Sequence, residues 1–209
     1  RKLVNDERTF RRCTSFLNPK GDDVVLLIED KEKNTRLDLL EMDYYRNLIV
    51  DERFSQHLEQ TETVRTNTFS CRSESMILNY ENVRVLSAII SKQIRKYYTS
   101  GQACLNIWHF DAEDGIVLSL PMTITNWHHE ALGGIQIYIS DAVEKEIQTR
   151  TATSPVKETG GCLFGSYDRD HNSIYVYYMI PAPKDSIHSP ISFVRGFNGL
   201  TTEYERITK

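Results

Sequence analysis

Residues 81–98, ENVRVLSAIISKQIRKYY, form the clearest periodic segment of the chain and predict an amphipathic helix. Apolar side chains recur there at three- and four-residue steps, which places them on one face of a helix: Val83, Leu86, Ile90, Ile94 and Tyr97. Short apolar runs lie on either side of it, VVLLIE at 24–29, CLNIWHF at 104–110 and GIVLSLP at 115–121. The first run predicts a buried strand, and the other two predict a hairpin around the turn DAED. Strands interspersed with helices place the chain in the α/β (mixed α+β) class.

A second helix is predicted over residues 38–50, with Asp38 as its N-cap. The pattern changes at Gly133-Gly134, which we interpret as a domain boundary between residues 1–132 and 134–209. Residues 135–140 then alternate as a half-buried strand, and residues 141–150 predict a helix capped by Asp141. Two further strands are expected in GGCLFGSYD and NSIYVYYMIPAP.

Composition limits the classes of function. A formal net charge of -4 gives no basic stripe of the kind that nucleic-acid binding requires. No apolar run approaches the roughly 20 residues that span a bilayer, and no signal peptide is visible, so we expect a cytoplasmic protein without a membrane partner. The four cysteines form no CxxC pair, which argues against a zinc ribbon and a disulfide framework. Because the chain stops at Lys209 inside a predicted helix, we expect a fragment of a longer protein.

Three segments follow one another in the second half of the chain: KETGGCLFGSYD (157–168), IYVYYMIPAPKDS (174–186) and SPISFVRG (189–196). Together they resemble the first half of a JAB/MPN domain, the fold of the JAMM metalloproteases, and the resemblance covers residues 134–209. It implies that Glu158 is the general acid/base that hydrogen-bonds a zinc-bound water during peptide or isopeptide hydrolysis. Gly160 and Gly161 would let the backbone turn and pack closely behind it.

The sequence departs from that family in its metal ligands. The resemblance implies a His-x-His pair and a later Asp, yet no His-x-His follows Glu158, and His171 and His188 lack this pairing. The zinc ligands are therefore expected outside this chain. Taken without its context, a Glu before two glycines is better explained as an exposed loop acid, and only the surrounding matches favour the catalytic role.

Residues 1–132 resemble, through fewer features, the C-terminal portion of a ThiF-like adenylating domain of the ubiquitin-activating type. The matching segments include RLDLLEMDYYRNLI (36–49) and FSCRSES (69–75). In bacteria such domains occur fused ahead of JAB domains. An intact domain would use ATP and magnesium, but no glycine-rich phosphate loop occurs here, so we assign no nucleotide site.

Cys71 lies in a polar loop before the helix at 81–98, where the resemblance implies a cysteine that forms a thioester with a ubiquitin-like protein. Arg72 would favour the thiolate. The alternative is a plain loop cysteine. Cys104 and Cys162 are expected in the core. His128 and His129 are adjacent, so in a strand they would face opposite sides and not share an ion, and a polar linker is expected there.

Two functions follow from the resemblances. The first is a bacterial protein for activation and deconjugation of a ubiquitin-like protein, for example in antiphage defence. It would have deubiquitinase-like zinc hydrolase chemistry at Glu158 and a candidate thioester at Cys71. Its partners would be the ubiquitin-like protein and its conjugating enzyme, and a homodimer is compatible with it. The second is a catalytically inactive MPN-type scaffold, or a plain partner-binding module, whose unfinished sheet exposes edge strands.

Overall fold

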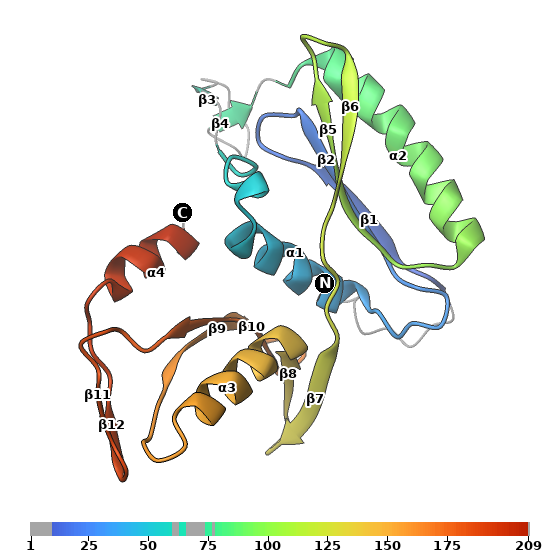
Figure 1. The fold of residues 1–209 in the computed structure, drawn as a ribbon. Helices are drawn as coiled ribbons and strands as arrows, with labels where there is room; N and C mark the ends of the chain where they lie inside the picture. Colours follow the sequence, from blue (N-terminus) through green and yellow to red (C-terminus); the bar gives the residue numbers. More distant parts are fainter. Residues whose placement is uncertain (1–9, 60–62, 66–73, 77, 209) are drawn as a thin grey trace. The chain divides into compact units, whose positions relative to one another are not determined.

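The computed structural model describes residues 10–59, 63–65, 74–76 and 78–208 (Figure 1). The chain is a mixed α/β protein, as the sequence predicts, and it divides into two compact units. The first unit extends to Ile124 and the second begins at Thr125. The division therefore precedes Gly133-Gly134, because these two glycines form the turn between paired strands of the second unit, with φ angles of 59° and 84°. Such positive φ angles suit glycine, which has no Cβ.

The first unit is built on an antiparallel sheet with the strand order β1-β2-β5-β6. These strands are β1 (Cys13–Leu17), β2 (Asp23–Ile28), β5 (Cys104–Asp111) and β6 (Ile116–Pro121). Helices α1 (Leu37–Val50) and α2 (Tyr80–Ser100) lie on opposite faces of the sheet (Figure 1). A short 3₁₀ helix follows α1 at Glu52–Phe54, and β3 (Thr63–Arg65) pairs with β4 (Glu74–Met76) apart from the main sheet.

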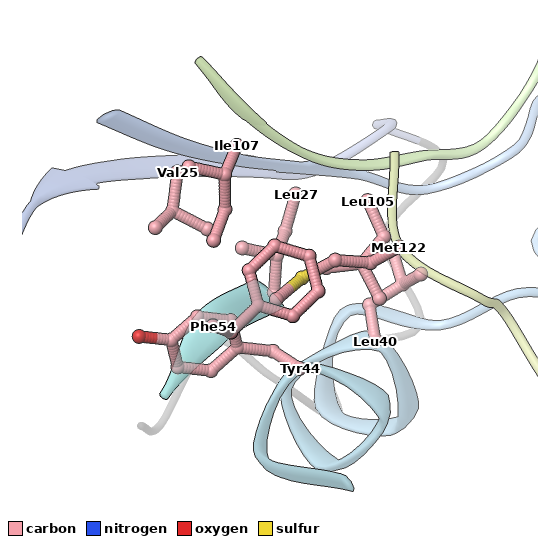
Figure 2. Close-up of a cluster of buried hydrophobic side chains, with 8 residues drawn as sticks. All are labelled: Val25, Leu27, Leu40, Tyr44, Phe54, Leu105, Ile107 and Met122. Atoms are coloured by element: carbon pink, nitrogen blue, oxygen red, sulfur yellow. The ribbon is translucent and has the colours of Figure 1, made fainter. Parts of the chain in front are cut away.

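Strand β2 is buried along its whole length because both of its faces are covered by helices. Val25 and Leu27 face α1, where they form a core cluster with Leu40, Tyr44, Phe54, Leu105, Ile107 and Met122 (Figure 2). Val24, Leu26 and Ile28 face α2 and pack on Leu86 and Ile90. The uninterrupted apolar run at 24–29 is thus explained by a central strand that is covered on two sides.

The second unit has a mixed sheet with the strand order β7-β8-β10-β9. Its strands are β7 (Trp127–Leu132), β8 (Ile135–Ser140), β9 (Gly161–Asp168) and β10 (Ser173–Pro181). Helix α3 (Asp141–Thr153) connects β8 to β9, β8 runs parallel to β10, and β9 lies antiparallel to β10 at the edge. The hairpin of β11 (Ile187–Ser189) and β12 (Ser192–Val194) follows, and α4 (Leu200–Thr208) completes the unit.

Aromatic side chains decide which face of β8 is buried. Tyr138 stacks on His129 of β7 and on Tyr175 of β10, with ring centroids 4.5 and 5.1 Å apart. Tyr138 is consequently buried, whereas Ile137 and Ile139 are only half-buried. The isoleucines of the alternating pattern are therefore not the most deeply buried face, because the stacked rings cross three strands.

The helix caps differ from those expected. Asp38 is not an N-cap, because α1 begins one residue earlier and Asp38 pairs with the guanidinium of Arg36. Ser140, rather than Asp141, caps α3 by accepting the Val143 amide. Residue type alone did not identify either cap, because the first turn of each helix starts earlier in the sequence than the predicted cap would place it. Among the helices of the described part, none is both long and apolar enough to cross a membrane.

Candidate functional site

Glu158 lies in the loop between α3 and β9, where the β11 segment holds its backbone. Its amide donates to the carbonyl of Ser189 at 2.8 Å, and its carbonyl oxygen accepts from Nδ1 of His188 at 2.9 Å. The Glu158 side chain is exposed. The backbone of Glu158 is therefore fixed by β11, while its carboxylate faces solvent.

The two glycines after Glu158 are required by close packing. A Cβ on Gly160 would lie 2.5 Å from the ring of Phe193, and one on Gly161 would lie 2.5 Å from the carbonyl oxygen of Ile180. Neither glycine has a positive φ, so the reason is close approach and not a left-handed turn. Close approach of two backbones, as predicted, occurs at Gly161, whereas Gly160 makes room for the side chain of Phe193.

The segments that the sequence singled out meet around this loop. Nη1 of Arg195 lies 3.0 Å from Sγ of Cys162, and Asp185 accepts from the backbone amides of Phe197 and Asn198 at 2.9 and 3.0 Å. Residues 158–162 and 185–198 are therefore joined through β11, β12 and these side-chain contacts.

Histidines are sparse near Glu158. His188 contacts its carbonyl, while His171 follows the far end of β9 and pairs with Asp168 at 2.8 Å. The eight residues of β9 separate the two ends by about 23 Å at roughly 3.3 Å per residue. His171 and Glu158 cannot share one ion, and within the described ranges no set of three metal-binding side chains forms at Glu158.

The remaining candidate residues are scattered. Cys71 lies outside the described residues. Cys104 is buried, as expected, and burial raises the pKa of its thiol to about 11. Cys162 is only half-buried rather than part of the core, because β9 is an edge strand. His128 and His129 belong to strand β7 and not to a linker, since they pair with β8 in a hairpin.

A polar cluster in the first unit was not foreseen from the sequence. Asp23, the first residue of β2, lies directly opposite His109 of β5, and its Oδ1 is 2.7 Å from Nδ1 of His109. Its Oδ2 is 2.6 Å from Nδ1 of His57, whose Nε2 is 3.1 Å from the hydroxyl of Tyr44. One buried carboxylate thus contacts two imidazoles.

Asn18 shapes the turn that presents this carboxylate and its neighbour. Its Oδ1 accepts from the backbone amides of Gly21, Asp22 and Asp23 at 2.9, 3.1 and 3.0 Å. Its Nδ2 donates to Oδ1 of Asp22 at 2.7 Å. The two consecutive aspartates are consequently held in place before β2 begins.

A cavity of about 210 Å³ opens beside this cluster. Its lining consists of polar residues with two apolar ones: Asn18, Lys20, Asp22, Asp23, Arg53, Phe54, Gln56, His57, His109 and Leu120. The consecutive aspartates before an apolar run were the one visible signal in the sequence. His57 and His109 lie 34 and 86 residues away from Asp23, and only the sheet pairing and the turn after α1 bring them together.

Comparisons with known proteins return no relative. No family model matches the chain, and no curated protein and no solved structure matches it. Any functional assignment therefore depends on the residues and on the geometry described above.

Proposed function

We propose that residues 134–209 form the first half of a JAB/MPN-type unit and that Glu158 is its general acid/base for hydrolysis of bonds made by a ubiquitin-like protein. The observation that supports this most is the place of Glu158, in the loop between α3 and β9, held by two backbone hydrogen bonds to β11. The succession of strand, helix, acidic loop and antiparallel strand pair agrees with the resemblance carried by the sequence.

The zinc ion that this family implies does not fit the residues around Glu158. Among the residues that the structure describes, His188 is the imidazole that hydrogen-bonds the loop, and its Nδ1 donates to the Glu158 carbonyl. No His-x-His pair occurs in residues 159–209. We therefore assign to these residues only the proton-transfer position, and the ligands remain a prediction for sequence outside residues 1–209.

The test uses the natural full-length protein and ubiquitin that carries a fluorogenic amide at its C-terminus. Glu158→Gln keeps the size of the side chain, but the amide of glutamine cannot act as a base at neutral pH. We therefore expect kcat/KM to fall by about 10²- to 10⁴-fold. Glu144→Gln, an exposed glutamate of α3, is the matched control and should leave the rate unchanged. Equal rates for Glu158→Gln and the unmodified protein would refute the assignment.

An inactive scaffold is the second candidate, and exposed apolar side chains favour it. On β11, β12 and the segments beside them, Ile187, Ile191, Val194 and Phe197 are 65%, 88%, 57% and 73% exposed. Exposed apolar groups that lie near each other in sequence and structure are typical of a surface that binds a partner. The proposed partner is the ubiquitin-like protein or its conjugating enzyme.

Binding measurements test whether the surface at β11 and β12 binds a partner. If this surface binds ubiquitin, Ile191→Ser should weaken the affinity by about tenfold or more in calorimetry, as loss of an anchoring apolar side chain does. Leu132→Ser is the control, because Leu132 is 71% exposed but lies on β7, at the other edge of the sheet. An equal effect of both substitutions would exclude a specific surface at β11 and β12.

For the first unit, a ThiF-like identity and a thioester at Cys71 remain proposals. The sheet of that unit is antiparallel throughout and adds no support of its own. A Cys71→Ser variant that no longer forms an adduct cleaved by added thiol or hydroxylamine would support the thioester.

A further inference from the structure

The Asp23 cluster holds two consecutive carboxylates in or beside the core, next to two imidazoles. Asp22 and Asp23 are consecutive carboxylates, and within the described ranges no Lys or Arg forms an ion pair with either of them. Two cations do line the adjoining cavity, but Lys20 pairs with Glu59 at 2.8 Å and Arg53 pairs with Asp51 at 2.6 Å. Asp23 contacts two imidazoles instead, and Asp22 accepts from the side-chain amide of Asn18.

The donor atoms of this cluster converge. One ligand atom each from Asp22, Asp23 and His109 lies within 4.8 Å of the other two. Two atoms bound to one ion at about 2.0–2.2 Å are separated by at most about 4.4 Å. Asn18 donates to Oδ1 of Asp22, but Asp22 and His109 are only half-buried, so small side-chain rotations would bring all three donors onto a single ion.

We propose that Asp22, Asp23 and His109 bind one divalent transition-metal ion at the mouth of the cavity in the first unit. Two carboxylate oxygens and one imidazole nitrogen suit zinc, manganese or iron(II) better than calcium, which prefers oxygen ligands alone. Three protein donors leave at least one coordination position open. The cavity is far larger than the roughly 10–15 Å³ that one water molecule requires, so solvent or a small ligand can occupy that position.

His57 and Tyr44 orient the central ligand. Burial raises the pKa of the Tyr44 hydroxyl well above its usual value, so this group stays protonated and can donate to Nε2 of His57. The proton of His57 then lies on Nδ1, where it is donated to Oδ2 of Asp23 and leaves Oδ1 for the ion. His109 would carry its own proton on Nε2 when Nδ1 binds the ion.

The proposal is tested by calorimetric titration of the 209-residue chain after chelation and dialysis, first with Zn²⁺ and then with Mn²⁺. We expect one saturable site for at least one of these ions. Asp22→Asn and His109→Gln should each weaken binding by more than about tenfold, and His57→Gln, which changes only the orientation of Asp23, by about 10- to 100-fold. Circular dichroism verifies that each variant is folded.

Matched controls separate this site from others. Asp114→Asn removes an exposed carboxylate from the turn after β5, and His128→Gln removes an exposed imidazole from β7, so neither should change the affinity. Glu158→Gln should also leave it unchanged, which keeps the outcome independent of the proposed hydrolase. Absence of saturable binding of both ions, or ligand variants that bind as tightly as the unmodified chain, would overturn the proposal.

Discussion

Replacing Arg12 by alanine is expected to destabilise the first unit by about 3 kcal/mol, because it leaves a buried carboxylate without its cation. The Glu29 side chain is 0% exposed, and its Oε1 accepts from Nη2 and Nε of Arg12 at 2.6 and 2.9 Å. Two backbone amides remain after the substitution, those of Arg12 itself and of Leu37 at the start of α1. These hydrogen bonds still stabilise the carboxylate, so the expected destabilisation is at the lower end of the range for removal of one member of a buried ion pair.

Chemical denaturation followed by tryptophan fluorescence measures this loss, since Trp108 is buried in the same unit. Arg53→Ala is the control, because it removes a solvent-exposed ion pair with Asp51 and should change the free energy of unfolding by less than about 1 kcal/mol. If Arg12→Ala is no more destabilising than Arg53→Ala, the Glu29 carboxylate does not depend on its cation.

The same ion pair predicts a pH dependence. Burial by itself would raise the pKa of Glu29, but hydrogen bonds from Arg12 and Leu37 outweigh it and hold this pKa below the usual 4.5. A carboxyl group whose pKa is lower in the folded state stabilises the protein above its unfolded pKa, and this stabilisation disappears as the pH falls through the folded value. The unmodified chain should therefore lose stability below about pH 4.5, and Arg12→Ala should lose less over the same interval.

Gly165→Val is expected to destabilise the second unit by about 3 kcal/mol, near the upper end of the usual effect of overpacking. A Cβ at Gly165 would lie 1.9 Å from the carbonyl oxygen of Tyr175, which belongs to the backbone of β10 and cannot rotate away. The register between β9 and β10 shifts between Val176 and Tyr178, so Gly165, which pairs with Val176, lies directly beside this bulge.

Hydrogen exchange of the amides in β9 and β10 measures this effect within the second unit. Leu163→Ala is the control on the same strand, since Leu163 is 54% exposed and its truncation should cost less than about 1 kcal/mol. Unchanged protection in Gly165→Val would show that β9 can shift away from β10 at no cost.

The elements with strong periodicity could be predicted well. The helix around residues 81–98 is α2, and Leu86 and Ile90 of its stripe are buried. The hairpin is β5 and β6, and the run at 24–29 gives the buried strand β2. These succeed because burial of one helical face, or of both faces of a strand, leaves a pattern that local sequence alone displays.

Predictions that depended on neighbours in space were less accurate. The sequence placed the domain boundary at Gly133-Gly134, where the structure has a hairpin turn, because a glycine pair is typical of both. Glu158 could be singled out through a run of matching segments, yet the hydrogen bonds that hold its backbone come from β11, some 30 residues later. A pattern read from neighbouring residues cannot predict a hydrogen bond between residues so far apart in the sequence.

The sequence by itself determined the mixed α/β class, the central strand and the place of Glu158 before two glycines. Only the tertiary structure decided that Asp23 contacts both His57 and His109, and that Glu29, the residue after β2, accepts from the first amide of α1. The physical reason is the range of the interactions. Hydrophobic periodicity is repeated within a single element, whereas a buried carboxylate is balanced by partners that only the pairing of distant strands and loops brings within about 3 Å.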